Sequence, residues 1–287
     1  MSARVDVRRT HKLFIGGQFP RSESGRTYEV SDHAGAFLAN VAQASRKDAR
    51  DAVTAAYKAF PGWSARTAYN RGQIVYRIAE VLEGRHDQLA MEVEAAEGCS
   101  ADAASRQVDQ AVDRLVWYAG WADKLAQVVG GTNPVAAPYF NFSLPEPTGI
   151  VAAIAPQGSS LLGLVEVIAP AITVGNVVVA VTSEARPVPA VSLAEVMAAS
   201  DVPGGVVNVL TGSATEMAPW LASHMDVNAI DLTGVEDPDL ATDLEVAAAE
   251  NLKRVRRPGL EDLDADPGLG RMLGVLETKT VWHPVGI

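Results

Sequence analysis

Short apolar runs alternate with amphipathic segments between residues 149 and 255, and this alternation constrains the fold more than any other feature. Apolar runs without polar alternation are typical of strands that are buried on both faces. Strands that alternate with helices pair in parallel and carry helices on the faces of one sheet. The sequence therefore predicts an α/β fold with a parallel sheet and flanking helices. The predicted strands are residues 149–156, 176–181, 206–210, 228–232 and 253–255.

The residues before this alternation have the periodicity of helices. Apolar residues follow Ser45 at helical spacing, and Ser45 is the expected N-cap of this segment. Further helical patterns follow at about residues 66–84, 86–97 and 101–124. The sequence therefore predicts an N-terminal helical region in front of the parallel sheet.

Two segments that lie far apart in the chain predict a second, antiparallel sheet. Residues 126–148 are rich in Gly, Pro, Val and aromatic residues, and they predict two strands joined by a turn. Residues 276–287 alternate as a strand does, with Thr278, Thr280 and Trp282 on one face. Since a lone strand is unstable, we expect the terminal one to join a sheet of this chain or of a partner.

A segment of different composition separates the last strand of the alternating series from the terminal segment. Residues 256–275 are charged, rich in Pro and Gly and without a period, which is typical of a linker. We therefore predict one unit over residues 1–255, a linker over residues 256–275 and a C-terminal strand over residues 276–287.

Composition and charge exclude several classes of partner. The chain has 24 Lys and Arg against 35 Asp and Glu, so its net charge is −11. Such a chain is a poor match for nucleic acid or an anionic membrane surface, because both require clustered Lys and Arg. The most apolar stretch, residues 161–181, is interrupted by Glu166, Pro170 and Asn176, which favours a buried helix and strand over a membrane span. A polar N-terminus and a single cysteine lead us to expect a cytoplasmic protein.

The candidate reactive side chains do not form a catalytic or metal-binding pattern. Glu97 and Asp102 flank Cys99 and would raise the pKa of its thiol, so we assign it no catalytic role. The five histidines lack the spacing of metal ligands, and we predict no metal site. Glu166 lies in an apolar helical segment, and we expect its carboxylate to reach water because an unpaired buried charge is costly.

Several motifs resemble one family in their order along the chain. The runs PTGIVAAIAP, IAPAITVGNVVV, SEARP, VPGGVVNVLTG and LTG resemble the cofactor domain of the NAD(P)-dependent aldehyde dehydrogenase superfamily. Residues 126–148 resemble its oligomerisation hairpin, and ETKTVW resembles its C-terminal oligomerisation strand. The ending TKTVWHP is also similar to the degenerate module of aldehyde dehydrogenase family 16. The resemblance implies a Rossmann-like sheet, a small antiparallel oligomerisation sheet, NAD as cofactor and oxidoreductase ancestry.

The resemblance implies a cofactor crevice but not a catalytic apparatus. Where the family has an oxyanion-hole Asn, an adenosine-ribose Lys and a pyrophosphate-contacting Ser, this chain has Gly158, Val181 and Val235. The segment RVRRPGLED replaces the motif that carries the general-base Glu, and a linker stands where the domain with the nucleophilic Cys would follow. The residues implied for the cofactor crevice are Ala155, Pro156, Gln157, Gly158, Ser183, Glu184, Gly212, Thr233 and Gly234.

Three functions remain open from the sequence. The first is a non-catalytic structural or regulatory subunit that joins a full-length aldehyde dehydrogenase, or itself, through the oligomerisation sheet. The second is an NAD(P)-dependent aldehyde oxidoreductase in which this cofactor domain works with a catalytic domain supplied in trans. The third is a binder of another nucleotide or adenine-type ligand at the carboxyl ends of the parallel strands, where such folds bind ligands.

Overall fold

The computed structural model describes residues 9–259 and 262–286 of the protein. Its centre is a parallel sheet whose described strands follow the order β10-β9-β6-β7-β8. The prediction of an α/β fold with a Rossmann-like sheet is confirmed. The expectation of a cytoplasmic protein depends in part on the first eight residues, which lie outside the described part. The strands are β6 (Ile150–Ile154), β7 (Val177–Val181), β8 (Val207–Leu210), β9 (Ala229–Asp231) and β10 (Arg254–Arg256).

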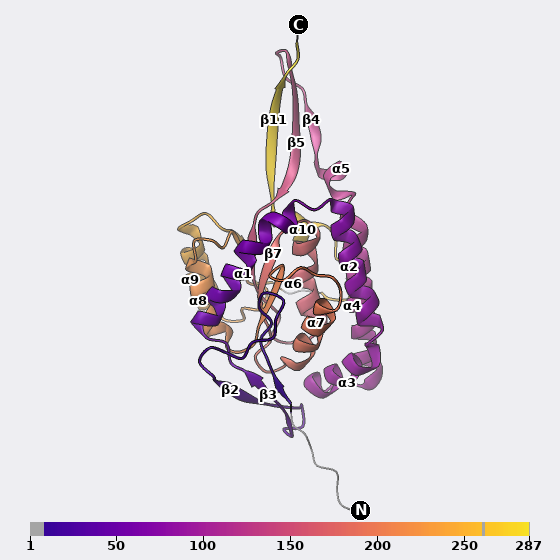
Figure 1. Ribbon diagram of the computed structural model, residues 1–287, viewed down its shortest axis with the longest axis vertical. Helices are drawn as coiled ribbons and strands as arrows, with labels where there is room; N and C mark the ends of the chain where they lie inside the picture. Colours follow the sequence, from indigo (N-terminus) through magenta and orange to yellow (C-terminus); the bar gives the residue numbers. More distant parts are fainter. Residues whose placement is uncertain (1–8, 260–261, 287) are drawn as a thin grey trace, which may run out of the picture.

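Helices cover both faces of this sheet (Figure 1). On one face α6 (Leu162–Thr173) packs on β6 and β7, and α7 (Val188–Ala198) packs on β8. On the other face α8 (Ala214–Ser223) packs against β6, and α9 (Pro238–Ala249) packs beside α8. Every residue of α6 is buried, because α2 and α4 cover the side of this helix that faces away from the sheet. This explains why α6 is apolar on all sides.

The N-terminal region contributes a small sheet and the outer helices. Its strands are β1 (Thr10–His11), β2 (Thr27–Ser31) and β3 (Phe37–Ala42), and its helices are α1 (Arg46–Ser64), α2 (Ala68–Glu83), α3 (His86–Glu97) and α4 (Ala101–Trp121). The predicted helical region is confirmed. Helix α1 packs on β7 and β8, on the same face of the central sheet as α8, whereas α2 and α4 form the outer layer over α6.

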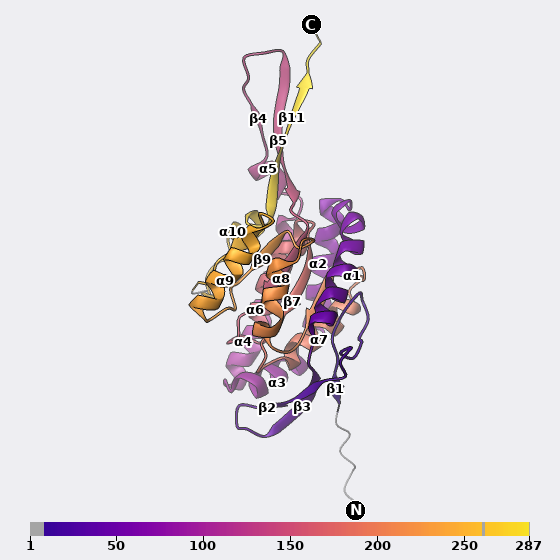
Figure 2. The same ribbon diagram turned by 90° about the vertical axis from the view of Figure 1, so that its left-hand side faces the viewer.

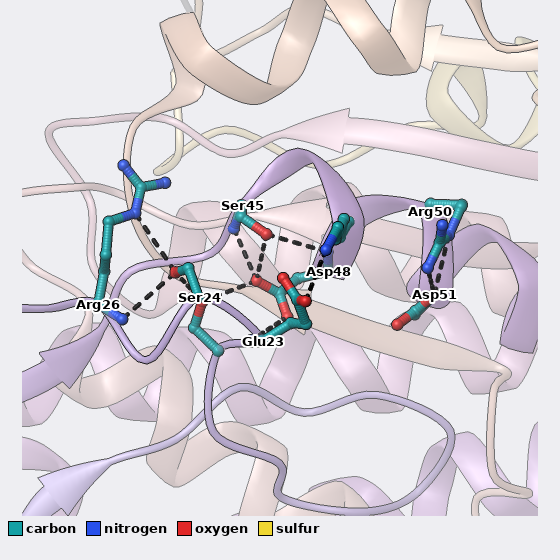
Figure 3. Close-up of polar contacts among 9 residues, drawn as sticks. Glu23, Ser24, Arg26, Ser45, Asp48, Arg50 and Asp51 are labelled. Atoms are coloured by element: carbon teal, nitrogen blue, oxygen red, sulfur yellow. Dashed lines mark hydrogen bonds and ion pairs between the residues drawn. The ribbon is translucent and has the colours of Figure 1, made fainter.

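Helix α1 begins in a dense polar network (Figure 3). Ser45 is its N-cap, as the sequence predicts, and Asp48 completes a capping box with it. The buried Asp48 carboxylate also accepts hydrogen bonds from Ser22 Oγ at 2.8 Å and from the Glu23 amide at 2.9 Å. One carboxylate therefore joins the start of α1 to the preceding loop.

A second sheet projects from the body as an arm (Figures 1 and 2). It consists of β4 (Gly131–Asn133), β5 (Tyr139–Pro147) and β11 (Leu276–Pro284), and the short helix α5 (Leu125–Val129) lies at its base. The described strands follow the order β11-β5-β4, and β11 runs antiparallel to β5 along its whole length. This arm is the small antiparallel sheet that the sequence predicts.

The segment predicted to be a linker carries structure where it is described. The short helix α10 (Gly270–Leu273) lies in it, and Arg271 and Met272 of this helix are buried. The predicted boundaries at residues 255 and 275 stay predictions, and residues 260–261 lie outside the described part. None of the described helices is long and apolar enough to cross a membrane.

Candidate functional site

The loops that follow β6, β7, β8 and β9 meet at one edge of the central sheet. Parallel strands end at the same edge, so segments that are distant in sequence come together there. Ser183 Oγ donates to the carbonyl oxygen of Gln157 at 2.9 Å, and the Glu184 amide donates to Gln157 Oε1 at 3.0 Å. The Gly234 amide donates to the carbonyl oxygen of Ile154 at 2.9 Å. The structure thus brings the loops with the predicted cofactor residues together, and their role in binding stays a prediction.

Two glycines shape this edge. A Cβ on Gly234 would lie 1.9 Å from the carbonyl oxygen of Ala155, so only glycine allows the loop after β9 to lie against the loop after β6. Gly212 has a φ of +120°, a conformation that L side chains rarely adopt. Both glycines therefore serve the backbone of the crevice itself.

A pocket of about 230 Å³ lies between α8 and α9 at this edge. Its apolar lining comes from Ala214, Ala218, Val235 and Leu240. Its polar lining comes from five residues, Gln157, Glu184, Thr215, Glu236 and Asp237. Gln157, Glu184 and Glu236 also border a neighbouring hollow of about 570 Å³, which Tyr28 and Glu29 line from the N-terminal sheet. We call the pocket between α8 and α9 the acidic pocket, because three of its side chains are carboxylates.

A second pocket, of about 420 Å³, lies where the loop after β6 meets α4. Pro156, Gly158 and Thr233 line it together with Glu97 and Gln107. Gly259, Leu263 and Asp264 of the segment predicted to be a linker form another wall. Gln110 Nε2 donates to Asp264 Oδ1 at 2.7 Å, which holds that wall against α4.

A buried cluster of charges lies beneath the edge and corrects one expectation. Glu166 was expected to reach water, but only 4% of it is exposed. Arg114 Nη1 lies 2.8 Å from Glu166 Oε1, and Tyr118 Oη donates to Glu166 Oε2 at 2.7 Å. Arg271 Nε is 3.9 Å from the same carboxylate. The expectation was wrong because α4 and α10 supply partners that offset the free-energy cost of burying this charge.

The same cluster reaches the loop after β9. Arg271 Nη1 lies 2.8 Å from Asp231 Oδ2. Asp231 Oδ1 accepts from the Thr233 amide at 2.9 Å, and the Thr233 hydroxyl also donates to it. Burial, followed by the nearby Glu166 carboxylate, raises the pKa of Tyr118, so its phenol stays protonated as a donor. A chain of hydrogen bonds and ion pairs thus joins α4, α6 and α10 to Thr233.

The structure places no thiol at these two pockets within its described residues. Cys99 lines neither pocket, and burial followed by the Glu97 carboxylate raises the pKa of its thiol. Gly158 offers no side-chain donor, and Arg186 Nη1 donates to its carbonyl oxygen at 2.8 Å. Val181 is fully buried in β7. Among the described residues, no group of His, Cys, Asp and Glu could hold a metal ion.

Sequence reasoning missed three residues that organise the crevice: Glu97, Asp231 and Asp237. Glu97 Oε1 accepts from the Ser160 amide at 2.7 Å, just before α6 begins. Asp237 caps α9 and accepts from the amide of Asp239 at 2.9 Å. The pair Asp237-Pro238 is typical of the start of a helix, so this cap could be predicted from the sequence. The contact of Glu97 depends on tertiary structure alone.

The residues of this edge suit one part of NAD(P) better than another. The acidic pocket has an apolar base and acceptors for hydroxyl or amine groups, which fits a nucleoside. A pyrophosphate needs free amides or cationic side chains, yet several amides of these loops already donate to acceptors of the chain. The first turn of α8 has no side-chain cap and Arg186 lies at the same edge, so NAD(P) binding by this chain stays a prediction.

Comparison with known proteins places this arrangement in a family. The model of the "Aldehyde dehydrogenase family" matches residues 19–257. An aldehyde dehydrogenase from Davidiella tassiana is 34% identical over 264 residues, covering 88% of this chain and 52% of that protein. Cytosolic aldehyde dehydrogenase 1 from Elephantulus edwardii is 33% identical, covering 89% of this chain and 52% of that protein. The chain thus spans about half the length of the curated relatives it matches.

Solved structures agree with the sequence comparison. HpcC from Thermus thermophilus is 32% identical with a TM-score of 0.81, over 86% of this chain and 47% of that one. A betaine aldehyde dehydrogenase from Staphylococcus aureus in complex with NAD+ is 25% identical with a TM-score of 0.80, over 85% of this chain and 49% of that one. The family model, the relatives and the shared fold together show that this chain belongs to the aldehyde dehydrogenase family.

Proposed function

We propose that this chain is a non-catalytic member of the aldehyde dehydrogenase family that assembles with a full-length aldehyde dehydrogenase, or with itself, through the arm. The observation that carries the proposal is the exposed apolar face of the arm, with an edge strand beside it. Such surfaces on a folded chain are typical of subunit interfaces.

One face of the arm carries exposed apolar side chains, with Lys279 and His283 beside them. Phe140, Phe142 and Leu144 alternate along β5, and Val281 is paired with Phe142 on β11, so all four point to the same side. Phe140 is 50% exposed and Leu144 is 44% exposed. The rings of Phe140 and Phe142 lie 5.4 Å apart between centroids, so these two side chains are in contact on this face. Burial of such a face stabilises an assembly by about 25 cal/mol per Å² of apolar surface.

The outer edge of β11 offers backbone groups for a further strand. Val275 accepts from the Thr148 amide at one end of the ladder, and the Val285 amide donates to Pro138 at the other. Because pairing to β5 alternates along an antiparallel strand, Thr280 and its even-numbered neighbours direct their N–H and C=O groups outward. In the described part of the chain no strand lies beyond β11.

The crevice supports a non-catalytic role. Its described residues place no thiol at either pocket, and Gly158 stands where the resemblance implies an oxyanion-hole Asn. Loss of one oxyanion donor alone reduces turnover by about 10²–10³. The alternative, oxidoreductase activity with a catalytic domain supplied in trans, requires NAD(P) binding at the acidic pocket.

Co-expression with a full-length aldehyde dehydrogenase of the same organism tests the proposal. We expect the two chains to co-elute on size exclusion with light scattering, or this chain to elute as a dimer when it is expressed alone. A Thr280→Pro variant removes an outward N–H while the ladder to β5 stays intact, and it should reduce assembly at least tenfold.

Thr280→Val is the matched control. It loses the same hydroxyl contact to Ser143, 2.9 Å in length, but keeps the backbone donor, and it should assemble as the parent does. A monomeric parent that elutes apart from its relative would refute the proposal. Aldehyde oxidation that depends on this chain and on NAD(P) in the mixture would favour the alternative.

A further inference from the structure

We propose that β11 pairs antiparallel with β11 of a second copy of this chain, about a two-fold axis at Thr280. The two three-stranded arms would then form one continuous sheet. This inference rests on the proposed function and deepens it, because it names the partner of the arm and the register of the contact. The backbone groups of the free edge, the charges along β11 and the place of the arm on the molecule support it.

The free edge of β11 complements itself. The odd-numbered residues of the strand bond to β5, as the bonds of Val275 and Val285 at its two ends show. The even-numbered residues therefore direct their N–H and C=O groups away from β5. A two-fold contact presents the same edge on both copies, and antiparallel strands then oppose each free donor with a free acceptor.

The length of β11 favours an axis at Thr280, which is the midpoint of the strand Leu276–Pro284. With this axis the two strands pair over their whole length, and Leu276 of each copy lies opposite Pro284 of the other. Pro284 has no N–H, but here it lies at the end of the ladder, where its missing donor interrupts nothing. Thr278 of each copy lies opposite Trp282 of the other, which pairs a β-branched side chain with an aromatic ring that is 57% exposed in the single chain.

Charge and chain length disfavour the two neighbouring registers. An axis at Lys279 would place the two Lys279 side chains directly opposite each other, and like charges at such positions are destabilising. An axis at Val281 would place Pro284 opposite Thr278, so the residue without an N–H would lie within the paired row. With the axis at Thr280, Lys279 of each copy faces Val281 of the other.

The charged side chains of β11 have counterions within their own chain. A lysine on an edge strand often prevents pairing, because its charge must stay in water. Here Lys279 Nζ lies 3.0 Å from Glu146 Oε1 on β5. Glu277 Oε1 lies 2.7 Å from Arg254 Nε. Pairing of two such edges therefore brings no uncompensated charges together.

The joint sheet would also extend the exposed apolar side chains of the arm. Phe142 and Val281 are paired on β5 and β11 of one chain. With the axis at Thr280, the Val281 side chains of the two copies become diagonal neighbours across the contact, within reach of each other. Apolar side chains of the two arms then lie on one face of one sheet.

The place of the arm allows this contact without a collision of the two bodies. The arm projects from the body, and β11 runs outward along it (Figures 1 and 2). Antiparallel pairing therefore places the two bodies at opposite ends of β11, which at 9 residues is about 30 Å long. Parallel pairing would bring both bodies to the same end. In the described part of the chain no strand covers the outer edge of β11.

Sedimentation velocity of the full chain alone tests the pairing. We expect a dimer at about 50 µM that dissociates on dilution. Thr280→Pro should raise the dissociation constant at least tenfold, because it removes the outward N–H at the axis.

Disulfide cross-linking tests the register. Thr280→Cys, in a Cys99→Ser background that has no other thiol, places two thiols opposite each other with Cα atoms about 5.5 Å apart, within the range of a disulfide. Diamide joins the two thiols in one S–S bond and takes up the two protons and two electrons that they release. Thr278→Cys in the same background is the matched control, since its two copies would lie about 14 Å apart along the strands. We expect at least tenfold more covalent dimer from Thr280→Cys than from Thr278→Cys.

The outcomes separate this inference from the proposed function. Equal cross-linking of the two variants, or more from Thr278→Cys, would assign another register and overturn the inference. A dimer that Thr280→Pro leaves unchanged would do the same. A chain that is monomeric alone but co-elutes with a full-length aldehyde dehydrogenase would overturn the inference and leave the proposed function standing. A monomer that elutes apart from that relative would overturn both.

Discussion

Arg271 and Asp231 form a buried ion pair, with 2.8 Å between Nη1 and Oδ2, that joins α10 to the end of β9. Because Asp231 also holds the Thr233 amide and hydroxyl, the pair connects the segment after β10 to the floor of the crevice. Arg271 further approaches Glu166 of α6. Helix α10, which lies in a segment whose sequence is typical of a linker, therefore packs against the folded body.

Replacement of Arg271 by Ala should strongly destabilise the protein. It leaves the Asp231 and Glu166 carboxylates buried with one partner fewer, and breaking a buried pair on one side costs about 3–5 kcal/mol. Urea unfolding followed by circular dichroism measures the effect. Arg254→Ala is the control, since its pair with Glu277 is exposed and should contribute about 1 kcal/mol or less. Equal losses in the two variants would contradict the role of the cluster.

Stability should fall as the pH rises above about 10, the usual pKa of a tyrosine. Burial is the first cause that raises the pKa of Tyr28 and of Tyr118, and neighbouring carboxylates add to it. The unfolded chain releases these phenolic protons at a pH at which the folded chain retains them, so stability is full below pH 10 and is lost above it. Thermal unfolding between pH 8 and 11 measures this slope. The double variant Tyr28→Phe, Tyr118→Phe should flatten it, and an unchanged slope would show that other groups cause it.

Gly234→Ala should disrupt the crevice. The added Cβ would lie 1.9 Å from the carbonyl oxygen of Ala155, so one of the two loops must move. We expect a loss of several kcal/mol in the free energy of unfolding, on the scale of overpacked sites. Gly120→Ala is the control, because nothing lies within 4 Å of its Cβ position, and in a helix it should stabilise by about 0.5–1 kcal/mol. A Gly234→Ala protein as stable as the parent would contradict the close approach.

Asp48→Ala should loosen the start of α1 (Figure 3). Its carboxylate accepts from Ser22 Oγ, the Glu23 amide, and the amide and hydroxyl of Ser45. Loss of a buried acceptor shared by several donors should cost about 2 kcal/mol or more. Asp51→Ala is the control, since Asp51 is exposed on the same helix and its carboxylate pairs with Arg50 at 3.0 Å. Hydrogen exchange at residues 45–49 should rise only in the Asp48 variant.

Much of the fold could be predicted from the sequence because its signals are local. The apolar runs of β6 and β7 mark strands that are buried on both faces, and Ser45 with Asp48 marks the start of α1. The meeting of the loops with Gln157, Glu184 and Gly234 follows from the parallel order of the strands. The pairing of β11 with β5 was also expected, from the resemblance of both segments to the family's oligomerisation sheet.

The sequence by itself determined the order and type of the elements, because hydrophobic period and caps act within a few residues of the chain. Tertiary structure decided which charges could be buried and which amides stayed free. Glu166 is buried because Arg114 and Arg271 reach it from two other helices, and Glu97 occupies the Ser160 amide from the end of α3. The cost of a buried charge depends on its neighbours in space, and no local pattern specifies them.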